Sequence, residues 1–261
     1  MLRHPPLVAQ DFINGIIRTL DPKTASEKGY YFFNVIQITN AKGYGEGTIT
    51  DPTQVGLKAP DDKTVVISLD NPAPQAFFVL NSFQTTPLHK PSFDEFGEKF
   101  VEAGNQVGNG AYVLKENVPQ SHVLLVKNPN YWDAANVKID QVRYVVTEDV
   151  NTELKRYLAG EIDTTNEIPS DQRESLKAQL GGEVREMIST ETMYISFNVT
   201  KPPFDDVRVR QALSMAIDRE ALQDKVLKAG YKANYSYVPA VDPTYEGPKV
   251  AEAGMSKEER E

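Results

Sequence analysis

Residues 108–146 read GNGAYVLKENVPQSHVLLVKNPNYWDAANVKIDQVRYVV. Three stretches within this segment are rich in β-branched and aromatic residues and are separated by turn residues. They predict strands at 111–115, 122–127 and 142–146. Helical patterns flank the segment on both sides, so we expect a mixed α/β fold.

Downstream of this segment, helices and strands alternate. The sequence predicts a helix over 149–159, with Asp149 as its N-cap and Gly160 just beyond its end. A short strand is expected at 161–165 and a helix at 171–180. Further on, a strand at 192–199 and a helix at 206–217 complete this pattern.

Upstream, a short amphipathic helix is expected over 11–20, ended by Asp21-Pro22. A β-hairpin follows, with one arm at 55–58 and the other at 64–69, and a further helix begins near 75–80. The side chains of Tyr131 and Trp132 are expected to pack the end of a hairpin onto the sheet at 111–146.

Composition excludes several function classes. The chain has 261 residues, a formal net charge of −9 and no basic run, which argues against nucleic-acid binding. Cysteine is absent, so disulfides, thiolate metal sites and cysteine nucleophiles are excluded. No apolar stretch reaches 18 residues, and the start, Met1 to Pro6, lacks the apolar core of a signal peptide.

The sequence also lacks a recognisable catalytic or metal motif. The three histidines lie in unrelated segments without ligand spacing, so we expect no metal site. No Gly-x-Ser-x-Gly nucleophile elbow occurs. Most of the carboxylate pairs are better explained by turns and helix caps, so nothing in the residue patterns indicates a catalytic site.

Five ordered blocks carry a specific resemblance. They are GNGAYVLK at 108–115, NPNYWD at 128–133, IDQV at 139–142, YLAGEID at 157–163 and PFDDVRVRQAL at 203–213. In this order and at these spacings they resemble the extracytoplasmic solute-binding proteins, family 5, which feed peptide ABC transporters. The oligopeptide-binding and murein-peptide-binding members are the most similar.

The resemblance implies a periplasmic-binding-protein-like fold of two lobes and an extra domain, only partly present here. Complete members are roughly twice this length. It assigns 1–90 to the later part of the extra domain, 91–191 to the central part of lobe I and 192–261 to the beginning of lobe II. The chain is thus expected to be an internal fragment.

The resemblance also supplies candidate ligand-binding residues. The segment after Glu161-Ile162-Asp163 faces the cleft in this family, so Asn166 and Glu167 are expected to contact an extended peptide. Tyr30 and Tyr31 lie in a segment near the ligand in the larger members. In this family a lysine can bind the carboxylate of the peptide. The position of this chain that matches the lysine holds Leu227, and Lys228 is its neighbour.

The function implied is that of the peptide-binding component of an ABC importer, a binding protein rather than an enzyme, which closes its lobes around an oligopeptide and needs no metal or organic cofactor. Its partners would be the ligand and the permease subunits in the membrane, and not nucleic acid. The resemblance implies a periplasmic or membrane-associated extracytoplasmic location, and we expect a monomer.

Three alternatives stay open. The same fold could bind another solute, such as a dipeptide, a murein peptide, a nickel complex or haem. The chain could be a fragment without function, which would expose apolar faces and associate. An enzyme built on carboxylates around Glu161, Asp163 or Glu167 is the third alternative, and it predicts a steep pH–rate profile.

Overall fold

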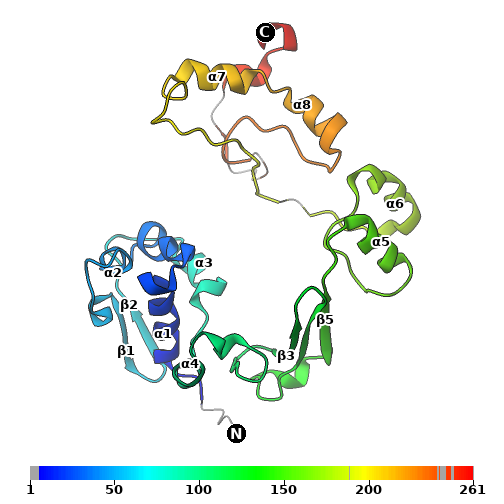
Figure 1. Ribbon diagram of the computed structural model, residues 1–261. Coiled ribbons are helices and arrows are strands. Elements are labelled where there is room, and N and C mark those ends of the chain that lie inside the picture. Colours follow the sequence, from blue (N-terminus) through cyan, green and yellow to red (C-terminus); the bar gives the residue numbers. More distant parts are fainter. Residues whose placement is uncertain (1–5, 188, 240, 242–244, 248–249, 261) are drawn as a thin grey trace. The chain divides into compact units, whose positions relative to one another are not determined.

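The computed structural model describes residues 6–187, 189–239, 241, 245–247 and 250–260. The chain divides into two compact units, residues 1–146 and residues 147–261. Figure 1 labels helices and strands of each. Residues 1–5 lie outside the described residues. They make up most of the start, Met1 to Pro6, in which the sequence predicts no apolar core of a signal peptide. Within the described part, no helix combines the length and the apolar character needed to cross a bilayer.

The first unit contains four helices and five strands among its described residues. The helices are α1 (Ala9–Leu20), α2 (Ala41–Gly45), α3 (Ala76–Leu80) and α4 (Lys90–Phe96), and the strands are β1 (Leu57–Asp61), β2 (Thr64–Ile67), β3 (Tyr112–Val118), β4 (His122–Lys127) and β5 (Gln141–Val145). The second unit contains helices only: α5 (Val150–Leu158), α6 (Arg173–Leu180), α7 (Val207–Met215), α8 (Arg219–Ala221) and α9 (Lys257–Arg260), as far as its residues are described.

The core of the first unit forms around α1. Apolar residues recur at helical spacing along α1, and Ile13, Ile16 and Leu20 are buried. They pack with Phe32 and with residues of the β1–β2 hairpin in one cluster. The Ala9 amide donates to the Asp62 carbonyl at 2.8 Å, which fastens the start of α1 to the hairpin turn. The predicted helix at 11–20 and the predicted hairpin are both confirmed.

A second sheet has the antiparallel order β3–β4–β5 and contains the three strands predicted within 108–146. The expected role of Trp132 is wrong, because its side chain is 85% exposed and its ring contacts that of Tyr131 at 5.7 Å. The buried Asn128 holds this turn instead. Its amide donates to the Gly110 carbonyl at 2.9 Å and its Oδ1 accepts from the Asn130 amide at 3.0 Å.

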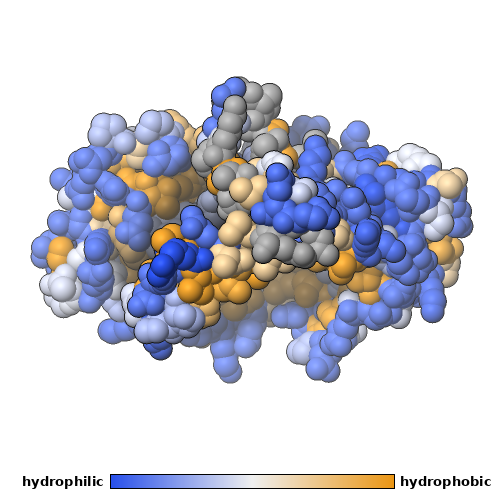
Figure 2. All heavy atoms as spheres, turned by 90° about the horizontal axis from the view of Figure 1, so that it is seen from above, coloured by the Kyte–Doolittle hydropathy of each residue, from blue (hydrophilic) through white to orange (hydrophobic). Residues whose placement is uncertain are grey.

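In the second unit the helices appear as predicted and the strands do not. The helices α5, α6 and α7 confirm the predictions at 149–159, 171–180 and 206–217. The predictions of strands at 161–165 and 192–199 are wrong, because both segments are irregular. A strand requires a hydrogen-bonded neighbour, and the described residues of this unit include no strand that could pair with them. Apolar residues also remain at the surface among hydrophilic ones (Figure 2).

Candidate ligand-binding loop and adjoining sites

The loop between α5 and α6 carries Asn166 and Glu167, and its beginning is firmly held. Gly160 turns the chain at the end of α5 with a φ of +73°, a conformation that glycine adopts without strain. The Arg156 guanidinium then pairs with Glu161, with Nε 3.1 Å from Oε2. The same side chain donates to Thr147 Oγ1 at 3.2 Å. Arg156 therefore joins the start of the loop to the residues that precede α5.

The far end of the loop is also held. Pro169 is buried, and Gln172 Nε2 donates to Asn151 Oδ1 of α5 at 3.0 Å. Between these anchors, Asn166 and Glu167 are exposed. Neither side chain makes a hydrogen bond or ion pair with any described residue. An amide that can donate and accept, next to an acceptor-only carboxylate, suits the main chain of a peptide or its amino group.

Tyr30 and Tyr31 form a second candidate group, which lies in the first unit. Their ring centroids are 4.2 Å apart and the rings are tilted by 31°. Tyr31 begins a π-helical turn, Tyr31–Val35, in which Phe32 is fully buried. Tyr31 packs against the core while Tyr30 remains exposed. The buried Phe32 thus determines which of the two rings faces the solvent.

Lys228 is the fifth predicted residue and lies in the second unit. It ends the π-helical turn Leu222–Leu227 with a left-handed φ of +51°. The side chains of Lys228 and its neighbour Lys225 are exposed, and neither forms an ion pair with a described residue. The ammonium group is available to an anion, and the structure connects it to no other predicted residue through a hydrogen bond or ion pair.

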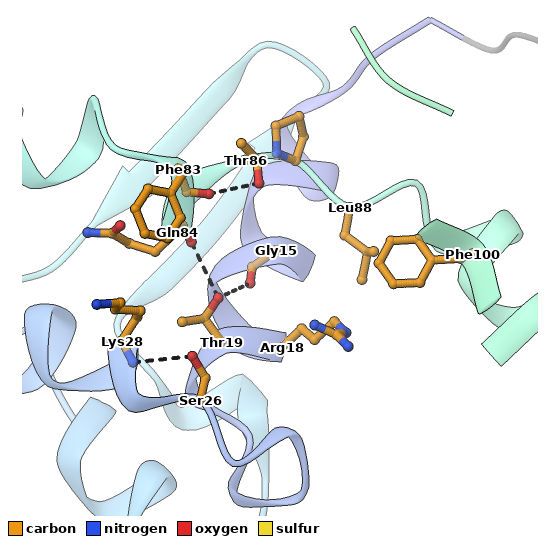
Figure 3. A pocket seen from close by; sticks show the side chains of 11 residues that line it. Gly15, Arg18, Thr19, Ser26, Lys28, Phe83, Gln84, Thr86, Leu88 and Phe100 are labelled. Carbon is orange, nitrogen blue, oxygen red and sulfur yellow. Dashed lines mark hydrogen bonds between the residues drawn. The ribbon is translucent and has the colours of Figure 1, made fainter. Parts of the chain in front are cut away.

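Sequence reasoning missed a cavity of about 250 Å³ in the first unit (Figure 3). Its floor is α1, where Thr19 Oγ1 donates to the Gly15 carbonyl at 3.1 Å and to the Gln84 carbonyl at 3.3 Å. Arg18 and Lys28 lie on either side of Thr19. None of the five predicted residues lines this cavity. The signal in the sequence was Gly15, a glycine within an otherwise regular helix.

Arg18 has structural partners at the edge of this cavity. Its Nη2 lies 2.6 Å from Glu98 Oε2, and its guanidinium lies 5.4 Å from the ring centroids of both Phe93 and Phe100. A guanidinium placed on aromatic rings is attracted by their quadrupoles. Arg18 therefore fastens the segment that contains α4 to α1.

Three described carboxylates of the second unit have pKa values below the ordinary range. Hydrogen bonds from Thr152 lower the pKa of Asp149, and those from Arg208 lower the pKa of Asp206. Lys177, followed by Arg173, lowers the pKa of Glu186. These groups are ionised caps and ion-pair partners, whereas a carboxyl that acts as a general acid needs a raised pKa. Among the described residues, no three His, Cys, Asp or Glu side chains are arranged to hold a metal ion.

The model of the bacterial extracellular solute-binding proteins, family 5, matches residues 5–257. The chain belongs to this family. The periplasmic oligopeptide-binding protein OppA of Escherichia coli is 37% identical over 264 residues, which cover 98% of this chain and 47% of OppA. The chain thus spans about half the length of the curated relatives that it matches.

Solved structures agree with this assignment. The murein tripeptide binding protein MppA of Escherichia coli matches with a TM-score of 0.90 and 35% identity, over 98% of this chain and 50% of that one. OppA of Haemophilus influenzae in complex with the peptide RPPGFSPFR matches with a TM-score of 0.86 and 31% identity, over the same shares. The expected fold is confirmed: a mixed α/β, periplasmic-binding-protein-like fold, of which this chain spans about half.

Proposed function

We propose that this chain is part of the peptide-binding component of an ABC-type importer and contacts an extended oligopeptide. The observation that supports this most is the family match over residues 5–257, together with relatives named for oligopeptide and murein-peptide binding. Its partners would be the peptide and the membrane permease, and its location periplasmic, as for the relatives.

The division of the chain in this proposal follows the family. Residues 1–90 correspond to the later part of the extra domain, 91–191 to the central part of lobe I and 192–261 to the beginning of lobe II. Lobe closure around the peptide would exclude bulk water, and water-filled pockets would tolerate varied side chains.

Asn166 and Glu167 would supply the first contacts with the ligand. The Asn166 amide can donate to a peptide carbonyl and accept from a peptide N–H, which binds the main chain without regard to side chains. The Glu167 carboxylate would bind a peptide ammonium group. In this proposal the exposed ring of Tyr30, supported by Tyr31, stacks against the ligand, and Lys228 pairs with a peptide carboxylate.

Calorimetric titration of the whole chain with the peptide RPPGFSPFR tests the proposal. We expect binding that Asn166→Ala and Glu167→Gln each weaken about tenfold, because each removes one polar contact with the ligand. The matched control is Glu191→Gln, which neutralises an exposed carboxylate outside the loop. It should leave the affinity unchanged.

The other outcomes contradict different parts of the proposal. Binding that neither loop variant weakens would refute the assignment of the loop as a contact site. A folded chain that gives no heat with the peptide would refute peptide binding by this chain. Turnover of the peptide, with a steep pH–rate profile, would favour the enzyme alternative.

A further inference from the structure

A second cavity of the first unit, of about 320 Å³, is lined in part by α2. Its volume lies at the lower end of the range for small-molecule sites, about 300–1,000 Å³. The apolar part of its lining consists of Phe33, Ile38 and Ile49, which belong to the core or pack against it. Polar side chains come from 37–42 and from 70–71. The cavity thus combines an apolar side with several polar groups, as ligand sites do.

Two of the polar residues at this cavity have a left-handed backbone. The φ angle is +54° at Gln37 and +61° at Asn40. Glycine would adopt either angle without strain, and asparagine visits this region more readily than glutamine does. Strained residues of this kind are concentrated at ligand sites, where the surrounding structure holds them. The strain at Gln37 therefore indicates that its side chain has a role that glycine could not fill.

The polar groups at the cavity are held in place but keep hydrogen-bonding capacity. Asn71 Nδ2 donates to Gln37 Oε1 at 2.6 Å, which leaves the Gln37 amino group and Asn71 Oδ1 without a partner among the described residues. Asn40 Nδ2 donates to the Gln54 carbonyl at 2.8 Å, and its Oδ1 accepts from no described residue. The Asp70 carboxylate forms no hydrogen bond or ion pair with the described part of the chain. The cavity therefore offers both donors and acceptors to a ligand.

The charges at the cavity narrow the class of ligand. An anion would be repelled by Asp70 and by the net charge of −9. An ammonium ligand would meet the like charge of Lys42, which also lines the cavity, and would leave the Gln37 donor unmatched. A hydroxyl group both donates and accepts, so a neutral polyhydroxylated ligand suits both kinds of polar group. The apolar side at Phe33 requires a C–H face, which a pyranose ring has.

We propose that this cavity binds a neutral monosaccharide. The side chains of Gln37, Asp70 and Asn71 hydrogen-bond to its hydroxyl groups, and its C–H face packs against Phe33 and Ile49. The cavity shares no residue with the loop that carries the candidate ligand-binding residues of the second unit. This proposal therefore does not depend on peptide binding.

Saturation-transfer NMR of the whole chain with a mixture of glucose, galactose, mannose and N-acetylglucosamine tests the proposal. We expect transfer to the C–H protons of at least one sugar, whose affinity is then measured by calorimetric titration. Asp70→Ala should weaken binding of that sugar about tenfold, because it removes a hydrogen bond to a charged acceptor. The matched control is Asp62→Ala, which removes an exposed carboxylate from the turn of the β1–β2 hairpin. It should change the affinity less than twofold.

Gln37→Gly separates a binding role from a structural one. Glycine relieves the strain at a φ of +54°, so the melting temperature should not fall, whereas loss of the amide should weaken sugar binding about fivefold. Absence of transfer to all four sugars would overturn the proposal, as would equal weakening by Asp70→Ala and Asp62→Ala. Displacement of the sugar by the peptide RPPGFSPFR would place it in the peptide site and would also overturn the proposal.

Discussion

Replacement of Phe32 tests whether the first unit has the core described above. The Phe32 side chain is fully buried among α1, the π-helical turn and the β1–β2 hairpin. Phe32→Ala removes its apolar contacts and leaves a cavity, which costs about 3–5 kcal/mol. The matched control is Phe77→Ala in α3, where the side chain is 83% exposed. A substitution at such a surface position usually changes stability by less than about 0.5 kcal/mol.

Urea unfolding followed by circular dichroism at 222 nm measures the difference. With a slope of about 2 kcal/mol per M, Phe32→Ala should lower the unfolding midpoint of the first unit by about 1.5–2.5 M, and Phe77→Ala by at most about 0.25 M. Equal shifts for the two variants would refute the placement of Phe32 in the core. A shift larger for Phe77→Ala would indicate that the exposed phenylalanine is covered in solution.

Three further predictions follow from other parts of the structure. Gly15→Ala should lower the melting temperature, because the new Cβ would lie 2.2 Å from the Thr86 carbonyl oxygen, and this clash outweighs the preference of alanine for helices. The matched control is Gly45→Ala, whose Cβ meets only ordinary contacts. It should leave the melting temperature unchanged or raise it. Asp149→Asn should destabilise α5 at neutral pH. Unfolding measured over a range of pH should show that the difference in stability between the two proteins shrinks as the pH falls below about 3.9 and through the lowered pKa of Asp149 in the folded chain, because the carboxylate is then protonated. Trp132 fluorescence should have a solvent-exposed emission maximum and full acrylamide quenching in the native chain, and a blue-shifted, protected spectrum would contradict its exposure.

Elements specified by local chemistry were predictable from the sequence. Asp149 caps α5 because its carboxylate accepts from the Thr152 amide at 2.8 Å, and Gly160 ends the helix because it adopts a positive φ. Both signals lie within a few residues of the helix that they bound. The turns between β3, β4 and β5 are similarly local, so these strands were placed correctly.

Elements that depend on distant residues were not predictable. The segments at 161–165 and 192–199 have strand-like sequences, but whether they form strands depends on a neighbour that no local pattern supplies. The cavity above α1 arises because residues 84–88 cross Gly15, some 70 residues away along the chain. Periodicity within α1 does not indicate which segment crosses it.

The candidate site was predicted only through the family resemblance. Nothing in the local pattern distinguishes Asn166 and Glu167 from other exposed loop residues. The structure adds the anchors Arg156 and Gln172, which hold the loop at its two ends. Neither anchor was identifiable from the sequence. Arg156 acts through a contact with Thr147, before α5, and Gln172 acts through a contact with Asn151 on α5.

The arrangement around α1 also determines when the contacts of this helix can form during synthesis of the chain. The helix packs against the β1–β2 hairpin, and its Asp11 carbonyl accepts from the Leu88 amide at 2.9 Å. About 70 residues separate the end of α1 from Leu88, which take the ribosome roughly 3–14 s at 5–20 residues per second. Until then this contact of α1 cannot form. The full set of contacts around α1 is therefore completed only seconds after the helix itself has been synthesised.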